Sequence, residues 1–153
     1  MSQQEERTLV IIKPDAVQRG LIGKISMRFE ERGLKIAAGK FIHLSMQKAE
    51  ELYAPHKGKS FYDSLTKFIT SGPVMALVLE GPQVIKQVRT MMGSTNCLEA
   101  QPGTIRGDFG LSIQNNLIHG SDSPENAKRE IAVFFTHQDI CEYSKAEEEW
   151  VMV

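Results

Sequence analysis

The apolar residues of this 153-residue chain fall into short runs that alternate between the patterns of strands and of helices. Residues 9–12 (LVII) and 74–79 (VMALVL) are continuously apolar and rich in branched side chains, which is typical of buried strands, and a further strand is expected at 35–44. Apolar side chains at helical spacing predict helices over residues 22–29, 45–53, 61–69, 84–92 and 123–135. This alternation alone predicts an α/β fold with a parallel sheet.

Three segments lack a sustained period. Residues 93–110 contain Pro102 and several glycines, and they are interpreted as a long ordered loop, a feature that is usually functional in a compact domain. Residues 116–120 are a short segment expected at an edge of the sheet, and the tail beyond Thr136 is expected to be irregular. No repeat, linker or low-complexity stretch divides the chain, so we expect one domain over residues 1–153.

Charge and cysteine content narrow the function. Lys and Arg number 18 against 19 Asp and Glu, so no overall field attracts nucleic acid or an acidic membrane, and any anion site must be built locally. The two cysteines, Cys97 and Cys141, form neither a disulfide framework nor a metal motif. The N-terminus fits neither a signal peptide nor a membrane span. We therefore expect a cytoplasmic protein without membrane partners.

One segment matches part of the glycine-rich phosphate-binding loop. Residues 58–60 (GKS) supply the end of GxxxxGK[ST], but the first glycine of that motif falls on Tyr53. The segment also follows a predicted helix, whereas the motif requires a preceding strand. An ordinary polar turn is the favoured interpretation.

Of the four histidines, His119 has the most suggestive neighbours. His43, His56 and His137 lie in a strand, a polar turn and the tail, where a histidine is usually only hydrogen-bonded or solvated. His119 lies in NNLIHGSDS, just before a predicted helix whose N-terminal dipoles favour negative charge. From these residues alone, a catalytic and a structural role remain equally open.

The same segment resembles the N-x-x-H-G-S-D signature of nucleoside diphosphate kinases. Three further blocks, ERTLVIIKPDAVQRGLIGKI, SGPVMALVLEG and QPGTIRGDFG, are similar to that family in the same order, so the resemblance covers nearly the whole chain. It implies a ferredoxin-like α+β fold, βαββαβ, with an antiparallel four-stranded sheet and additional helices. This expectation replaces the parallel sheet.

The resemblance implies transfer of a γ-phosphoryl group from a nucleoside triphosphate to a nucleoside diphosphate by a ping-pong mechanism through phosphohistidine at His119. An imidazole with a pKa of about 6.5 is largely neutral at pH 7, is nucleophilic without a separate base and forms a labile N–P bond. The family pattern gives Glu130 the task of orienting His119 and gives Ser121 the task of supporting Glu130. Without the signature, a solvated carboxylate and a helix cap would be the simpler readings.

The matched positions also imply a nucleotide site. The family pattern puts Arg89, Thr95 and Arg106 on the phosphates, Lys13 and Asn116 on the sugar hydroxyls, and Tyr53 in the wall of the site. Phe61 and Ile113 would hold the base between them by stacking, which discriminates poorly among bases. Taken singly, each of these residues also fits a surface, capping or packing role. Mg²⁺ is implied as a cofactor bound mainly through the nucleotide phosphates, with no metal ligands from the protein.

Members of this length usually form hexamers, with the loop from Gly93 onward at trimer contacts, and tetramers occur among relatives. The chain departs from the family at Cys97, where proline is common, over residues 97–101, and in the tail from Tyr143 to Val153. The alternative function is a catalytically silent scaffold or a nucleic-acid-binding protein of the same fold. Every matched catalytic position is filled, which argues against a silent homologue. The net charge of −1 argues against nucleic-acid binding, which normally requires a basic stripe, although a local basic patch stays open.

Overall fold

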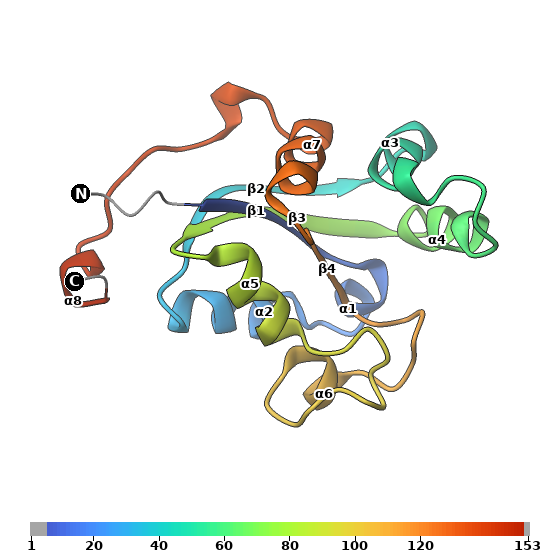
Figure 1. Cartoon of the computed structure of the whole chain (residues 1–153), viewed down its shortest axis with the longest axis horizontal. Coiled ribbons are helices and arrows are strands. Elements are labelled where there is room, and N and C mark those ends of the chain that lie inside the picture. Colours follow the sequence, from blue (N-terminus) through green and yellow to red (C-terminus); the bar gives the residue numbers. More distant parts are fainter. Residues whose placement is uncertain (1–5, 152–153) are drawn as a thin grey trace.

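A four-stranded antiparallel sheet forms the centre of the protein, which a computed structural model describes over residues 6–151 (Figure 1). The strands β1 (Glu6–Ile12), β2 (Lys35–His43), β3 (Pro73–Gly81) and β4 (Ile118–Gly120) lie in the order β2-β3-β1-β4. Each neighbouring pair is antiparallel. The α+β expectation is confirmed and the parallel sheet is wrong. The expected domain also includes residues 1–5 and 152–153, which lie outside the described residues.

The parallel prediction failed because each crossover skips a strand. Strands β1 and β2 both pair antiparallel with β3, so they point the same way but do not touch. They are linked through α1 (Pro14–Gln18) and α2 (Ile22–Glu31). In the same way α5 (Val84–Met92) links β3 to β4 across β1. The alternation of strands and helices indicates which strands a helix connects. It does not indicate that a third strand lies between the two connected strands in the sheet.

Helices cover both faces of the sheet (Figure 1). Helices α1, α2 and α5 pack below it in this view, whereas α3 (Met46–Leu52) and α7 (Pro124–Phe134) lie above it. Helix α4 (Tyr62–Ile69) lies beyond the end of β3, and its apolar residues join the core on the side of α3 and α7. Val10 and Ile12 of β1 face the first set, and Leu9 and Ile11 face the second. Because both faces are buried, β1 is continuously apolar and does not alternate.

Helix starts largely follow the predicted caps. Ser45 and Ser123 accept hydrogen bonds from the backbone N–H groups of Lys48 and Asn126, at the starts of α3 and α7. The loop prediction for residues 93–110 was wrong in part, because α6 (Ile105–Phe109) begins there after the cap of Thr104. Helix α1 and the short helices η1 (Ala54–His56), η2 (His137–Asp139) and α8 (Glu148–Val151) were also not predicted.

The short helices escaped prediction because three to five residues are too few to display a helical period. Within the described part of the chain, no helix has the length and apolar character needed to cross a membrane.

Cys97 occupies the second position of a tight turn. The N–H of Glu99 donates to the carbonyl of Asn96 at 3.0 Å, which makes Cys97 residue i+1 of the turn, where proline is favoured. Its side chain is buried and packs against the backbone at Gly110.

We therefore expect Cys97→Pro to raise the free energy of unfolding by about 0.4 to 1 kcal/mol, because proline restricts the unfolded chain and suits this turn. Thermal midpoints of the two proteins at equal concentration provide the measurement. Cys141→Pro is the contrasting variant, since the N–H of Cys141 donates to the carbonyl of Ala37 and its loss should destabilise. A lower midpoint for Cys97→Pro would contradict the prediction.

Candidate active site

One cleft of about 600 Å³ gathers side chains from both helical layers and from the strand ends. Every predicted site residue except Ser121 lines it: Lys13, Tyr53, Phe61, Arg89, Thr95, Arg106, Ile113, Asn116, His119 and Glu130. Ser121 is buried behind Glu130. Positions more than 100 residues apart in the chain therefore contribute to one concave site.

His119 is positioned by the pairing of β4 with β1. Its Cα partner is Ile11, so its side chain lies on the face covered by α7. The adjoining Gly120 allows the close approach of β4 to α5, because a Cβ atom there would lie 2.6 Å from the sulfur of Met92. Arg89 of α5 donates from Nη1 to the carbonyl of Gly120 at 3.2 Å, which fastens the helix to the strand.

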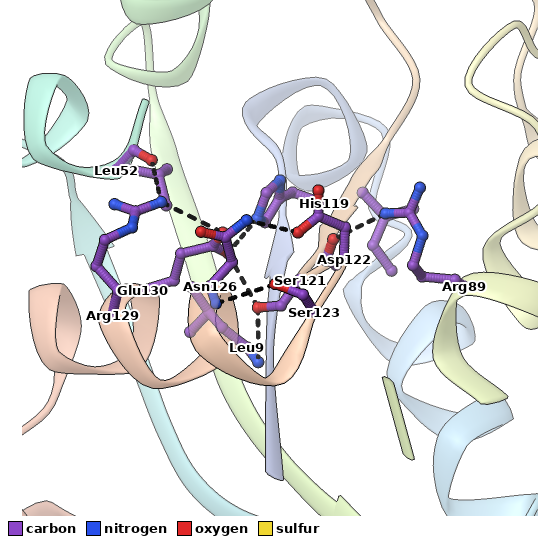
Figure 2. A network of polar contacts seen from close by, with 12 residues as sticks. Leu9, Leu52, Arg89, His119, Ser121, Asp122, Ser123, Asn126, Arg129 and Glu130 are labelled. Carbon is purple, nitrogen blue, oxygen red and sulfur yellow. Dashed lines mark hydrogen bonds and ion pairs between the residues drawn. The ribbon is translucent and has the colours of Figure 1, made fainter. Parts of the chain in front are cut away.

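A hydrogen-bonded chain fixes the His119 imidazole (Figure 2). Nε2 of His119 lies 2.7 Å from Oε1 of Glu130, and the hydroxyl of Ser121 donates to the same oxygen at 2.9 Å. An ionised carboxylate only accepts hydrogen bonds, so Nε2 carries the proton and Nδ1 keeps its lone pair. The geometry therefore leaves Nδ1 as the nucleophilic nitrogen.

Glu130 is itself held from two sides. The Ser121 hydroxyl accepts from the backbone N–H of Leu9 at 3.3 Å, which ties the carboxylate to β1. Arg129 Nη2 lies 3.7 Å from Oε2 of Glu130, and its guanidinium donates to the carbonyls of Glu51 and Leu52 at the end of α3. These contacts link α7, β1 and α3 around one carboxylate.

The floor of the cleft carries two buried cations. Lys13 Nζ donates to Oδ1 of Asn116 at 2.7 Å. Arg106 donates from its three nitrogens to the carbonyls of Asn116, Gly93 and Ile118. These three bonds use three of the five N–H groups of the guanidinium, which leaves two for a ligand.

Burial perturbs both cations. Burial, aided by the charge of Arg106, lowers the pKa of Lys13 to about 8, and burial lowers the pKa of Arg106 to about 10. Burial and the negative charge of Glu130 raise the pKa of the Tyr53 phenol, which therefore keeps its proton. An anion bound beside Lys13 and Arg106 would relieve the cost of desolvating both cations.

The mouth of the cleft is apolar and open. Phe61 and Ile113 remain 44% and 61% exposed although both line the cleft. The aromatic ring of Phe61 lies beside His56, at a centroid distance of 5.4 Å, and the ammonium of Lys59 lies 5.8 Å from its centroid. Two exposed apolar side chains at the rim can hold a flat ligand by contact with its faces.

The cleft also contains residues that sequence reasoning missed. His56 was interpreted as an ordinary turn residue, yet it lines the cleft 6.2 Å from the ring of Tyr53 and near Phe61. Burial, together with the charges of Lys59 and His119, lowers its pKa. Asp122 and Arg129 line the cleft as well. The proximity of His56 to Tyr53 and Phe61 in sequence was the available signal.

A second, larger cavity of about 1020 Å³ lies between α7 and the C-terminal tail. Its lining includes Lys35, Glu80 and Tyr143 and none of the predicted site residues. Lys35 donates to the carbonyl of Tyr143 at 2.6 Å, so this cavity is bounded by the docked tail. The chemistry-bearing residues lie in the smaller cleft.

The cleft offers little to a metal ion by itself. Among residues 6–151, no group of three or more His, Cys, Asp and Glu side chains is arranged to hold one. The two carboxylates of the cleft are already engaged, Glu130 with His119 and Asp122 with Asn126 Nδ2 at 2.7 Å. A metal here would need ligands supplied by a bound molecule.

Comparisons with known proteins agree with this geometry. A family model described as "Nucleoside diphosphate kinase" matches residues 6–140. A nucleoside diphosphate kinase of Listeria monocytogenes serotype 4b (strain F2365) is 56% identical over 146 residues, which cover 95% of this chain and 99% of the relative. One from Archaeoglobus fulgidus is 52% identical over 146 residues, covering 95% of this chain and 97% of the relative.

A solved structure gives the same match in three dimensions. It is a halophilic nucleoside diphosphate kinase from Halobacterium salinarum in complex with CDP, with a TM-score of 0.95 and 48% sequence identity. The match covers 98% of this chain and 100% of that chain.

The buried bonds of Ser121 predict a stability effect. Ser121→Ala should lower the free energy of unfolding by about 1 to 3 kcal/mol, because the Leu9 N–H and the Glu130 carboxylate each lose a buried partner. Urea unfolding at fixed protein concentration measures the change. Ser71→Ala, at an exposed serine just beyond the end of α4, should stay within about 0.5 kcal/mol. Equal effects of the two substitutions would contradict the assigned network.

Proposed function

This chain belongs to the nucleoside diphosphate kinase family, and we propose that His119 is the residue that carries the phosphoryl group. The chain is accordingly an enzyme that transfers the γ-phosphoryl group of a nucleoside triphosphate to a nucleoside diphosphate. Transfer runs by the ping-pong mechanism of the family, through a phosphohistidine. The observation that carries the proposal is the bond between His119 Nε2 and Glu130, which frees Nδ1.

In the first half-reaction, the lone pair of Nδ1 attacks the γ-phosphorus. The N–P bond forms as the bond between the γ-phosphorus and the bridging oxygen breaks, and the nucleoside diphosphate leaves with that electron pair. Positive charge develops on the imidazole, where Glu130 stabilises it through the Nε2 proton. In the second half-reaction, a terminal phosphate oxygen of another nucleoside diphosphate attacks phosphorus. A P–O bond forms as the N–P bond breaks, and the electron pair of that bond returns to Nδ1 of His119.

We assign the phosphates to the cations and hydroxyl groups at the deep end of the cleft. Arg89, Thr95 and Arg106 line this end. Their free N–H and O–H groups can donate hydrogen bonds to the phosphoryl group during transfer. Tyr53, which keeps its phenolic proton, can donate a hydrogen bond beside His119, whose ring centroid lies 6.3 Å away. Arg129 and His56 are further polar groups of this wall.

We assign the sugar to the floor of the cleft, beside Lys13 and Asn116, and the base to the mouth. Lys13 and Asn116 already pair with each other, and together they offer donors and an acceptor to ribose hydroxyls. Phe61 and Ile113 would contact the two faces of the base. Contact with the faces reads no base edge, so this arrangement favours acceptance of both purines and pyrimidines.

We propose that Mg²⁺ reaches the site with the nucleotide. The engaged carboxylates of the cleft support coordination mainly through phosphate oxygens. When bound, the ion would neutralise phosphate charge during transfer.

We propose a homo-oligomer, a hexamer before a tetramer, and the segment after Gly93 supports this because Leu98 and Leu111 are 74% and 82% exposed. We also propose one kinase domain over residues 1–153 and a cytoplasmic location, which the free thiols of Cys97 and Cys141 support.

His119→Ala should abolish both transfer and covalent labelling, because it removes the phosphoryl carrier. After incubation with γ-labelled ATP, the wild-type protein should keep its label in base and lose it in acid. His56→Ala tests the other histidine of the cleft and should still be labelled, and His43→Ala controls for the substitution itself. A label retained on His119→Ala would overturn the assignment.

The pKa of Lys13 predicts weaker nucleotide binding at high pH. Lys13 is charged below about pH 8 in the free protein. Above that pH its amine must be protonated when ADP binds, and the free-energy cost of this protonation weakens binding. The phosphate pKa of about 6 lies below this window, so the ligand charge stays constant. The dissociation constant should therefore rise between about pH 8 and 9.5, by up to about tenfold per pH unit.

Titration calorimetry with Mg²⁺ and ADP measures this dependence. Lys13→Ala should bind weakly at every pH and lose the rise, because no group near pH 8 remains to titrate at that position. Arg106, with a pKa of about 10, titrates above the window. An identical pH slope in the wild type and in Lys13→Ala would contradict the assignment.

A further inference from the structure

A strained turn immediately precedes the reactive strand. Leu117 is fully buried and has a φ of 75°, in the left-handed region that residues with a Cβ rarely adopt. The N–H of Ile118 donates to the carbonyl of Asn116 at 2.8 Å, which defines a γ-turn centred on Leu117. Such turns with positive φ are rare and strained, so surrounding bonds must hold this one in place.

Bonds from two other segments clamp the turn. The N–H of Leu117 donates to Oδ2 of Asp15 at 3.1 Å, and the carbonyl of Leu117 accepts from the N–H of Lys13 at 2.8 Å. Arg106 holds the carbonyls on both sides, those of Asn116 and Ile118. Lys13 and Arg106, which are already assigned to the nucleotide, supply three of these four hydrogen bonds. Asp15 supplies the fourth.

Asp15 stands apart because it does not line the cleft. It lies in the first turn of α1, where helix dipoles favour a carboxylate. Its Oδ2 accepts the Leu117 amide, and its buried Oδ1 has no partner in the described part of the chain. A buried carboxylate oxygen without a partner is costly, which argues that this side chain serves the turn and not its own stability.

The turn at Leu117 determines the orientation of Asn116 before it and the start of β4 after it. Before it, Asn116 Oδ1 accepts from Lys13 Nζ and Asn116 Nδ2 donates to the carbonyl of Thr95. After it, β4 begins at Ile118. A relaxed backbone at Leu117 would rotate the Asn116 side chain away from Lys13, whereas His119 is fixed separately through β1 and Glu130.

We propose that Asp15 is a positioning residue for nucleotide binding: its carboxylate holds the strained Leu117 turn and thereby aims Asn116 and Lys13 at the sugar of the substrate. The proposal rests on the proposed function of Lys13 and Asn116. Burial and the charge of Arg106 lower the pKa of Lys13, whereas the negative charge of Asp15 raises it, with a smaller contribution from Cys97. Asp15 therefore favours the charged form of the ammonium that it helps to position.

Steady-state kinetics of Asp15→Ala and Asp15→Asn test the hydrogen bond. Asp15→Ala should raise the KM for both nucleotides on the order of tenfold or more, because the Leu117 amide loses a charged partner. In Asp15→Asn the amide oxygen can still accept from Leu117, so KM at pH 7 should return most of the way to the wild-type value. Asp63→Ala removes the equivalent first-turn carboxylate of α4 and should leave KM unchanged.

Phosphorylation of His119 by phosphoramidate, a donor without sugar or base, separates positioning from collapse of the fold. Asp15→Ala should be labelled at close to the wild-type rate, since the bonds of His119 and Glu130 do not involve Asp15. An unchanged KM in Asp15→Ala, no recovery in Asp15→Asn, or slow phosphoramidate labelling would each overturn the proposal. Labelling of His119→Ala would instead overturn the proposed function, so the two failures are distinguishable.

Discussion

The pairing of β4 with β1 is the constraint on which the site depends. Only three residue pairs form it, and the central one joins His119 to Ile11. Bonds at both ends extend the pairing, from the Ser121 N–H to the Leu9 carbonyl and from the Lys13 N–H to the Leu117 carbonyl. A slip by one residue would turn His119 toward the opposite face of the sheet, away from Glu130. Register thus fixes the reactive nitrogen before any ligand enters.

The second constraint is electrostatic. The chain has a net charge of only −1, yet Lys13 and Arg106 are both buried at one end of the cleft. Their lowered pKa values express the cost of burying two cations, and the charge of Asp15 near Lys13 and the carbonyl bonds of Arg106 offset only part of it. A bound phosphate therefore supplies the negative charge that these buried cations lack in the free protein. The same cations are already oriented by backbone carbonyls, so little reorganisation accompanies binding.

The sequence predicted the parts of the site better than its connections. Strands β1 and β3 could be recognised because burial on both faces makes them continuously apolar, and Ser45 and Ser123 marked helix starts. The direction of the sheet came from family resemblance, because periodicity does not encode which strand β3 lies beside. Helix α6 was missed because it spans only five residues and follows a stretch without a sustained period. Asp15 was missed because it acts through a contact made across the fold, which no local pattern records. His56 was missed because a histidine in a polar turn is usually only solvated, although its partners Tyr53 and Phe61 lie close to it in sequence.

The cleft changes character along its length, and this gradient suits an enzyme that must accept many nucleotides at one site. At the deep end, Glu130, Lys13 and Arg106 are buried and each is fixed by named hydrogen bonds. At the mouth, Phe61 and Ile113 are exposed. Ping-pong transfer brings donor and acceptor to the same histidine in turn, so the groups they share, phosphate and sugar, can be bound by rigid, directional contacts. The base differs between them, and a side chain that read its edge would favour one half-reaction over the other. Rigidity at the phosphate end and permissive contact at the base end are therefore two requirements of a single reversible reaction.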